Sequence, residues 1–217
     1  YWNDTPLIQY IIILFMFLAG TNFVLSYFAF KGKVNKIIND EEFILYSKFI
    51  IVFTLIVAGI IYYNSYLDNV LVFDHPLVFG AAEGSIRHAL FQVVAIITTT
   101  GFVTADYTLW SPFLLVFFFG LMFLGGSAGS TSGGVKVVRH LVLIKNGFLE
   151  FKRSLHPSAI LPVRYNNKSV SGEIVFNVLG FFILYMLSFI VGSLGFAFLG
   201  LDFESSIGVA ASSLGNV

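Results

Sequence analysis

The stretch Thr98-Thr99-Thr100-Gly101-Phe102 decides how this sequence is interpreted, because an apolar run ends there in a threonine cluster and a glycine. Glycine adopts backbone conformations that other residues rarely reach, so several carbonyl oxygens can be turned toward one point beside it. Rows of backbone carbonyls coordinate dehydrated cations in ion channels. The five residues predict an ion selectivity filter, although in a soluble protein such a stretch is more often a strand and a turn.

The residues before this stretch favour the filter interpretation. Ser85 to Ile97 has a helical apolar pattern but is only 13 residues long, whereas about 20 residues are needed to cross a bilayer. We therefore expect a re-entrant helix. Backbone that is not helical survives at membrane depth only where protein buries it or where it lines water. The threonines and the glycine that follow this helix therefore require a pore or a protein cavity.

The composition of the whole chain is that of an integral membrane protein. Of its 217 residues, 57% are hydrophobic, 18% aromatic and only 11% charged, and the mean hydropathy is +0.88. Such a chain is too apolar to form one soluble core with a water-facing shell. It has no cysteine, and its four histidines lack the spacing of metal ligands. We expect the lipid bilayer as its surroundings, no cofactor and no nucleic-acid partner.

Four apolar segments are long enough to form or begin a membrane span. They are Leu7 to Phe30, Phe43 to Tyr66, Pro112 to Leu124, which is interrupted, and Glu173 to Leu199. The expected fold is an all-α polytopic membrane protein built from repeats of helix, re-entrant pore loop and helix, like a potassium channel.

The basic residues support one topology. If Lys31 to Lys36 face the cytoplasm, alternation of the spans places eleven of the twelve lysines and arginines on the cytoplasmic side or at its edge, with Arg87 as the exception. An excess of lysine and arginine on cytoplasmic loops is the usual pattern of membrane proteins.

Ten consecutive small residues interrupt the third span, and they are the strongest helix-breaking segment of the chain. They are Gly125, Gly126, Ser127, Ala128, Gly129, Ser130, Thr131, Ser132, Gly133 and Gly134. An intramembrane serine protease is the alternative from another class, since a serine of this loop with His140 nearby provides the residue types of a nucleophile and a base. That alternative explains neither the threonine cluster nor the repeat described next.

The chain contains an internal repeat. A span, a short helix and Thr99-Thr100-Gly101-Phe102 are followed by a second span, a short apolar segment and Ser213-Leu214-Gly215-Asn216. In each unit the short helix directs its partly negative carbonyl end toward a site inside the membrane, which favours a cation. We expect a division into 1–42, 43–172 and 173–217. The chain begins at Tyr1 without a basic leader and stops within the second motif, so we expect it to be part of a longer protein.

Three motifs resemble the superfamily of bacterial potassium uptake proteins that includes TrkH and KtrB. They are ITTTGFVTADY (Ile97 to Tyr107), GGSAGSTSGGVKVVR (Gly125 to Arg139) and SSLGNV (Ser212 to Val217). The resemblance implies four helix, pore-loop, helix repeats around one pore within one polypeptide. This chain would comprise the closing helix of repeat two with its cytoplasmic loop, all of repeat three, and repeat four as far as its filter.

The resemblance also implies roles for the motif residues. Backbone carbonyls of Thr99, Thr100 and Gly101, followed by Phe102, would form one quarter of a potassium filter. Another quarter would comprise Ser213, Leu214, Gly215 and Asn216, which lack the aromatic residue after the glycine. The Gly125 to Gly134 loop would be a gate below the filter.

Lys136 and Arg139 are candidates for coupling the gate to a cytosolic partner, or they are ordinary anchors at the cytoplasmic side. By the same resemblance we expect potassium uptake without enzymatic activity, in the bacterial cytoplasmic (inner) membrane. We also expect a homodimer with a cytosolic nucleotide-binding regulatory subunit like TrkA or KtrA. A sodium-conducting or ion-coupled transporter on the same fold is the second alternative.

Overall fold

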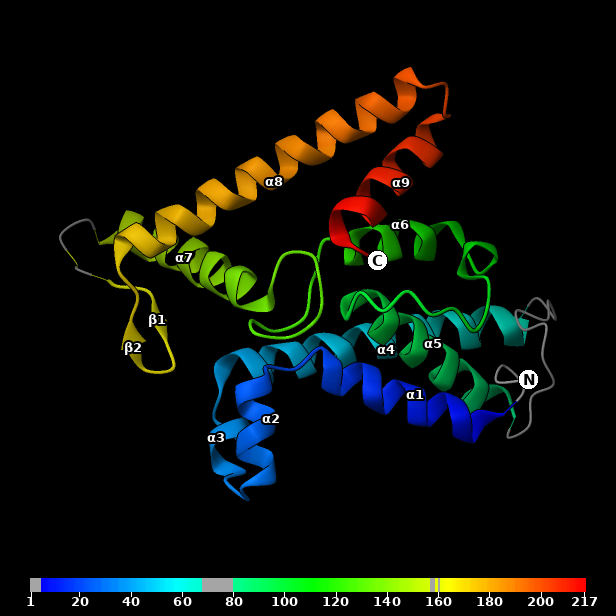
Figure 1. Ribbon diagram of the computed structural model, residues 1–217, viewed down its shortest axis with the longest axis horizontal. Coiled ribbons are helices and arrows are strands. Elements are labelled where there is room, and N and C mark those ends of the chain that lie inside the picture. Colours follow the sequence, from blue (N-terminus) through cyan, green and yellow to red (C-terminus); the bar gives the residue numbers. More distant parts are fainter. Residues whose placement is uncertain (1–4, 68–79, 157–158, 160) are drawn as a thin grey trace.

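The computed structural model describes residues 5–67, 80–156, 159 and 161–217, most of them in helices (Figure 1). The elements in chain order are α1 (Pro6–Ala19), α2 (Phe23–Phe30), α3 (Asn35–Ile38), α4 (Glu41–Leu67), α5 (Ala81–Ile97), the 3₁₀ turn η2 (Tyr107–Leu109), α6 (Pro112–Leu121), α7 (Val137–Leu155), β1 (Arg164–Tyr165), β2 (Lys168–Ser169), α8 (Gly172–Phe198) and α9 (Phe203–Gly215).

Within the described residues, α4 and α8 are each long and apolar enough to cross a membrane, and α1 with α2 makes a third span if the bent pair is counted as one. The all-α membrane fold expected from the sequence is confirmed.

The first predicted span is broken, which corrects the expectation of one helix from Leu7 to Phe30. α1 ends at Ala19, α2 begins at Phe23, and the two axes are bent by 111°. Asn22 starts α2, because its side chain accepts a hydrogen bond from the Val24 amide at 2.8 Å and so satisfies a free amide at the helix start. The three residues between the helices are therefore available for contacts that a continuous helix would not make.

The core lies where α5 packs against α4 and α1. α5 begins four residues earlier than predicted, and its second half is almost wholly buried, with Phe91, Val93 and Ile97 fully enclosed. Tyr46 and Ile61 face it from α4 with no exposed surface. A short helix enclosed in this way fits the predicted re-entrant helix.

The third span is interrupted as expected. α6 begins at Pro112, with Ser111 accepting a hydrogen bond from the Leu114 amide, and the helix ends after ten residues. The ten small residues then form a loop, hereafter the small-residue loop (Gly125–Gly134). A single parallel bridge between Leu124 and Val135 closes its neck.

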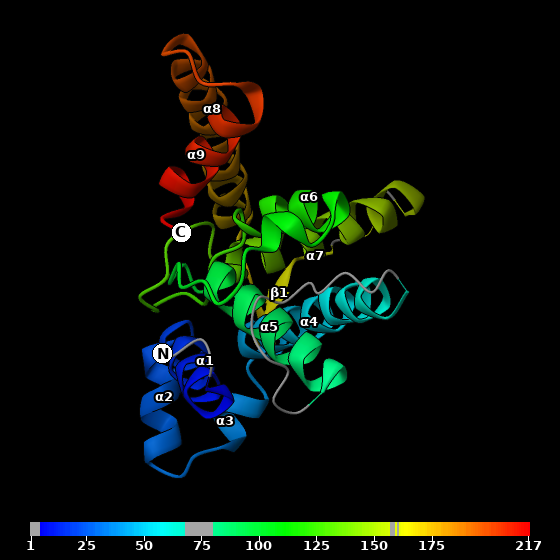
Figure 2. The same ribbon diagram turned by 90° about the vertical axis from the view of Figure 1, so that its right-hand side faces the viewer.

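The two ends of the molecule differ in charge and in the elements that lie there. α2, α3, the start of α4, the end of α7 and the hairpin β1–β2 gather on the left of Figure 1 and carry most of the basic residues; we name this the basic end. α8 runs from the basic end to the opposite end, where α9 turns back toward the middle. In Figure 2 the small-residue loop lies between α8 with α9 on one side and α1 with α2 on the other.

Candidate functional site

The threonine segment (Thr98–Phe102) leaves α5 through a left-handed turn. Thr99 has φ 53° and Gly101 has φ 72°, while the Thr100 amide donates to the Ala95 carbonyl at 2.9 Å. This bond across five residues, with a left-handed residue inside it, is the Schellman ending of a helix. The left-handed region costs a β-branched residue such as threonine about 1–2 kcal/mol, so this geometry is held by its surroundings.

The carbonyl oxygens of this segment accept no hydrogen bond from the residues that the structure describes. Within the described part of the chain, no hydrogen bond is donated to the carbonyls of Thr99, Thr100 or Gly101. Two side chains of the segment bond to each other and back to α5. The Thr98 hydroxyl donates to the Val94 carbonyl at 2.7 Å and lies 2.8 Å from the Thr100 hydroxyl. Polar backbone without a protein partner is costly inside a membrane, so these carbonyls are free for another ligand.

Buried polar residues of α5 hold the chain after the segment. The side chains of His88 and Gln92 lie one helical turn apart and reach the Thr104 hydroxyl at 3.2 and 3.5 Å, and Gln92 also donates to the Ala105 carbonyl at 3.2 Å. Arg87, which had been the exception to the charge rule, is buried, and its guanidinium pairs with Glu83 at 2.7 Å. The contacts of His88 and Gln92 hold the chain at Thr104 and Ala105 against the short helix.

The end of α9 has the same geometry as the end of α5 but in a different register, which corrects the predicted alignment. The Val217 amide donates to the Ser212 carbonyl at 3.1 Å, and Asn216 is left-handed with φ 61°. Asn216 therefore corresponds to Thr99, and Val217 to Thr100. Ser213, Leu214 and Gly215 lie within the last turn of the helix, so Gly215 is not the counterpart of Gly101.

The small-residue loop lies directly against both helix ends. The Gly133 amide donates to the Thr99 hydroxyl at 2.6 Å. A Cβ atom added at Gly133 would lie 2.5 Å from the Gly215 carbonyl oxygen. Only glycine fits there, so this position of the loop is fixed by close approach.

The break between α1 and α2 holds the other side of the loop. The amides of Ser127 and Thr131 donate to the carbonyls of Gly20 and Ala19 at 2.9 and 3.4 Å, and the Phe23 amide donates to the Gly129 carbonyl at 3.2 Å. The loop thus makes three backbone hydrogen bonds to the α1–α2 break, and an unbroken first helix would use those groups within itself.

The two predicted coupling residues make different contacts. The Lys136 ammonium turns back into the loop and donates to Ser130 and Ser132, including the Ser132 carbonyl. The Arg139 guanidinium lies 3.5 Å from the centre of the Phe181 ring on α8, a cation–π contact. Lys136 therefore stabilises the loop itself, and Arg139 joins α7 to α8.

The serines of the loop do not form a catalytic pair with histidine in the described residues. His140 Nε2 lies 3.4 Å from the Phe123 carbonyl oxygen. The Ser130 hydroxyl donates to the Ser127 carbonyl at 2.6 Å, and the Ser132 hydroxyl accepts from the Gly126 amide at 2.9 Å. A serine nucleophile needs a base within hydrogen-bond reach, so these contacts favour a structural role of the hydroxyls.

Comparison with known proteins identifies the family. The family model for TrkH, described as a cation transport protein, matches residues 1–217. The chain belongs to the TrkH family of cation transport proteins. It is 36% identical over 215 residues to the Trk system potassium uptake protein TrkH of Escherichia coli K12, covering 99% of this chain and 42% of that protein. It is 31% identical over 219 residues to TrkG of the same strain, covering all of this chain and 42% of that protein.

A solved structure of the TrkH family has the same fold. The crystal structure of the potassium transporter TrkH from Vibrio parahaemolyticus matches with a TM-score of 0.86 and 30% sequence identity, covering 98% of this chain and 44% of that one. The chain spans about 42% of the length of the curated TrkH relatives it matches. Its relatives are named for potassium uptake, and its apolar helices make it a multi-pass membrane protein.

Sequence reasoning missed two parts of the site. The first is the break at Gly20, and the second is Glu42, whose carboxylate accepts the Ala128 amide at 2.6 Å. Gly20-Thr21-Asn22 was a weak signal of the break, because such residues favour helix ends. Glu42 gave no local signal beyond its place at a helix start, since its partner lies 86 residues away.

Proposed function

We propose that the protein mediates transmembrane uptake of potassium through a filter of backbone carbonyls, and that the small-residue loop gates this pathway. The observation that carries the proposal is the left-handed turn at Thr99 and Gly101. No described residue donates a hydrogen bond to the carbonyls of this turn, which lies beside the tightly packed small-residue loop. In this mechanism the carbonyl oxygens replace the hydration shell of the ion, so no covalent chemistry and no cofactor are needed.

The proposed ion-binding groups follow the corrected register. The carbonyls of Thr99, Thr100 and Gly101 would contribute one part of the filter, with Phe102 following them. Asn216, at the end of α9, would contribute to the next part at the position that corresponds to Thr99. Ser213, Leu214 and Gly215 would instead direct the carbonyl end of the helix toward the ion, where its partial negative charge is favourable.

The wider setting of this activity is part of the same proposal. The basic end would face the cytoplasm of a bacterial cell, in the inner membrane. Names of relatives that contain "Trk system" support a multi-component assembly. We infer a homodimer with a cytosolic nucleotide-binding subunit like TrkA or KtrA. The division of the chain into 1–42, 43–172 and 173–217 stays a prediction of the repeat pattern.

Cation flux through the full-length protein in liposomes tests the filter. Transport of K⁺ and Rb⁺ in preference to Na⁺ and Li⁺ is the expected result. Gly101→Ser should shift the preference toward Na⁺, because a side chain disfavours the left-handed φ of 72°. Gly147→Ser in α7, where a Cβ meets nothing within 4 Å, is the matched control. Equal passage of Na⁺ in the unmodified protein would support the sodium-conducting or ion-coupled alternative.

Shortening the small-residue loop tests the gate. Removal of Ser130 to Ser132 should raise the flux, because the loop then loses its hydrogen bonds to Lys136. An unchanged or lower flux would show that the loop is only a structural break in the helix. Replacement of Ser127, Ser130 and Ser132 by alanine addresses the protease alternative, since transport through a gate should persist.

A further inference from the structure

Glu42 is a buried carboxylate with two backbone donors. Only 2% of its surface is exposed. One of its oxygens accepts from the Ala128 amide of the small-residue loop at 2.6 Å and from the Val138 amide at the start of α7 at 3.2 Å. A buried charge is stable only where such partners compensate for lost water. Since Lys136 at the start of α7 offers no side-chain cap, the carboxylate of Glu42 caps that helix from outside.

The two residues before Glu42 bind the hairpin β1–β2. The Glu41 carboxylate lies 2.7 Å from the Lys145 ammonium and accepts from the Asn166 amide at 2.9 Å. The Asn166 side chain completes the contact, because it accepts from the Glu41 amide at 2.9 Å and donates to the Asp40 carboxylate at 2.8 Å.

Tyr165 of the hairpin is affected by the charge of these acids. Its pKa is raised by burial and, after that, by the negative charges of Asp40, Glu42 and Glu41. Three consecutive acids thus contact the hairpin at one end and the small-residue loop at the other.

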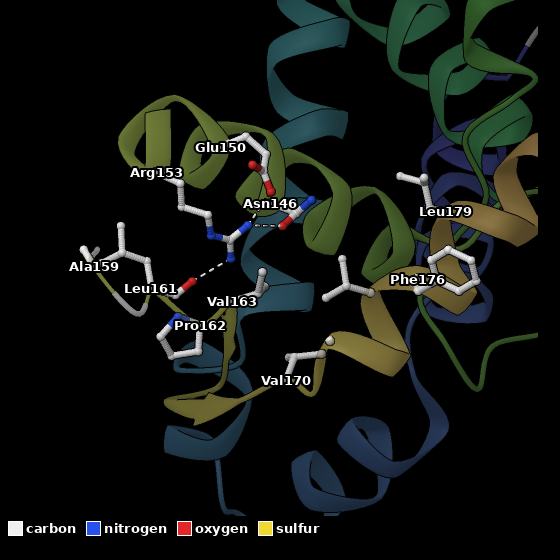
Figure 3. A pocket seen from close by; sticks show the side chains of 12 residues that line it. Asn146, Glu150, Arg153, Ala159, Leu161, Pro162, Val163, Val170, Phe176 and Leu179 are labelled. Carbon is white, nitrogen blue, oxygen red and sulfur yellow. Dashed lines mark hydrogen bonds and ion pairs between the residues drawn. The ribbon is translucent and has the colours of Figure 1, made fainter. Parts of the chain in front are cut away.

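The hairpin and the segment before it are also hydrogen-bonded to α7. The Lys145 ammonium donates to the Arg164 carbonyl at 2.8 Å. Further along α7, the Arg153 guanidinium donates to the Leu161 carbonyl at 2.6 Å and to the Asn146 side chain at 3.1 Å (Figure 3). These bonds cross one side of a cavity of about 550 Å³ between α7, the segment before β1 and α8. The segment and the hairpin are therefore attached to the helix that leaves the loop.

We propose that the run Asp40-Glu41-Glu42 links the hairpin β1–β2 mechanically to the small-residue loop, and that Glu42 is the positioning residue of that loop. A displacement of the hairpin at the basic end pulls on the start of α4 through Asn166. Glu42 transmits it to Ala128 and to the first turn of α7. The inference rests on the proposed function, because it takes the loop to control ion passage.

Neutralising Glu42 in the full-length protein tests the inner half of this link, which runs from Glu42 to the small-residue loop. Glu42→Gln keeps the shape but loses the charge that strengthens both bonds, and we expect the basal K⁺ flux to rise about tenfold. The half-saturating K⁺ concentration should stay the same, because the filter is untouched. Glu173→Gln is the control, since Glu173 lies in the first turn of α8 and is exposed. In the variant with the shortened loop, Glu42→Gln should add nothing.

Two closely matched variants in the hairpin turn test the outer half of the link, which runs from the hairpin to Asp40 and Glu41. Asn166 and Asn167 are both left-handed, with φ 46° and 62°, so glycine relieves similar strain at either position. Asn166→Gly removes two side-chain bonds to the acids, whereas Asn167 has no such bond to them. We expect Asn166→Gly to change the flux by several-fold and Asn167→Gly to leave it unchanged. The Asn166 effect should vanish in Glu42→Gln.

The results distinguish the proposed link through Glu42 from the proposed gating role of the small-residue loop. If shortening the loop raises the flux but Glu42→Gln leaves it unchanged, the link is refuted and the gate is retained. Equal effects of Asn166→Gly and Asn167→Gly would refute the outer half. Loss of flux in folded Glu42→Gln protein, judged by its thermal midpoint, would also overturn the positioning role. No effect of loop shortening would refute the gate itself.

Discussion

Adding one methyl group at Gly133 tests whether close packing holds the small-residue loop in place. The new Cβ would lie 2.5 Å from the Gly215 carbonyl oxygen and 2.7 Å from the Asn216 Cβ. Real Cβ atoms keep at least about 3.0 Å from such neighbours, so the two backbones must separate by about half an ångström or more. Overpacking of this kind costs about 1–3 kcal/mol. Gly133→Ala should therefore weaken the contact between the loop and the end of α9.

Flux and thermal denaturation of the full-length protein measure this effect together. We expect Gly133→Ala to raise basal K⁺ flux and to lower the thermal midpoint. Gly147→Ala is the control, since a Cβ there meets nothing within 4 Å, and alanine inside a helix stabilises by about 0.5–1 kcal/mol. If Gly133→Ala matched the unmodified protein in both measurements, the close approach of loop and helix would be refuted.

Three further predictions concern single groups of the site. Gly101→Ala should destabilise the folded protein by about 1–2 kcal/mol, measured by thermal denaturation, because its φ is 72° although space for a methyl group exists. Thr99→Val should raise flux, since the Gly133 amide loses its acceptor at 2.6 Å, and an unpaired amide costs about 1–3 kcal/mol; unchanged flux would contradict this. The pKa of Asp202 is lowered by hydrogen bonds from Ser205, so its cap on α9 is present above the ordinary aspartate pKa of about 3.9 and is lost as the pH falls below it. Hydrogen exchange of the α9 amides should rise in that acid range, and Asp202→Asn should remove this pH dependence.

The re-entrant helix and the small-residue loop could be predicted because their signals are local. A run too short to span, followed by Thr98 to Phe102, leaves few alternatives in so apolar a chain. Ten small residues in a row end any helix, and α6 does end at Leu121.

The register of the second motif could not be predicted, because glycine has two different uses. Gly101 is glycine because of its left-handed φ. Gly215 is glycine because a Cβ would lie 2.8 Å from the Met122 carbonyl oxygen, and it has no positive φ. Asn216 takes the left-handed position instead, as asparagine sometimes does at helix ends. The amino-acid sequence alone does not distinguish a glycine needed for its positive φ from one needed for close packing.

The break in the first helix was missed for a related reason. A single glycine within an apolar run is compatible with an ordinary helix. The partners that use the break, Ser127 and Thr131, lie more than 100 residues along the chain.

The α1–α2 break holds the loop through main-chain atoms, and this limits what mutational scanning can detect. The acceptors at Ala19 and Gly20 are carbonyl oxygens, which every amino acid carries, so replacing the Ala19 side chain leaves its bond intact. The donors at Ser127 and Thr131 are amides and are equally insensitive to side-chain exchange. Relatives can therefore diverge in sequence at Ala19, Ser127 and Thr131 while they keep the same contact, whereas Gly20 is fixed for another reason, since a Cβ there would lie 2.4 Å from the Tyr46 hydroxyl. Replacing the Ser127 amide by an ester would remove the hydrogen bond to the Gly20 carbonyl itself. It would show how far the position of the loop depends on this bond, which an alanine scan leaves intact.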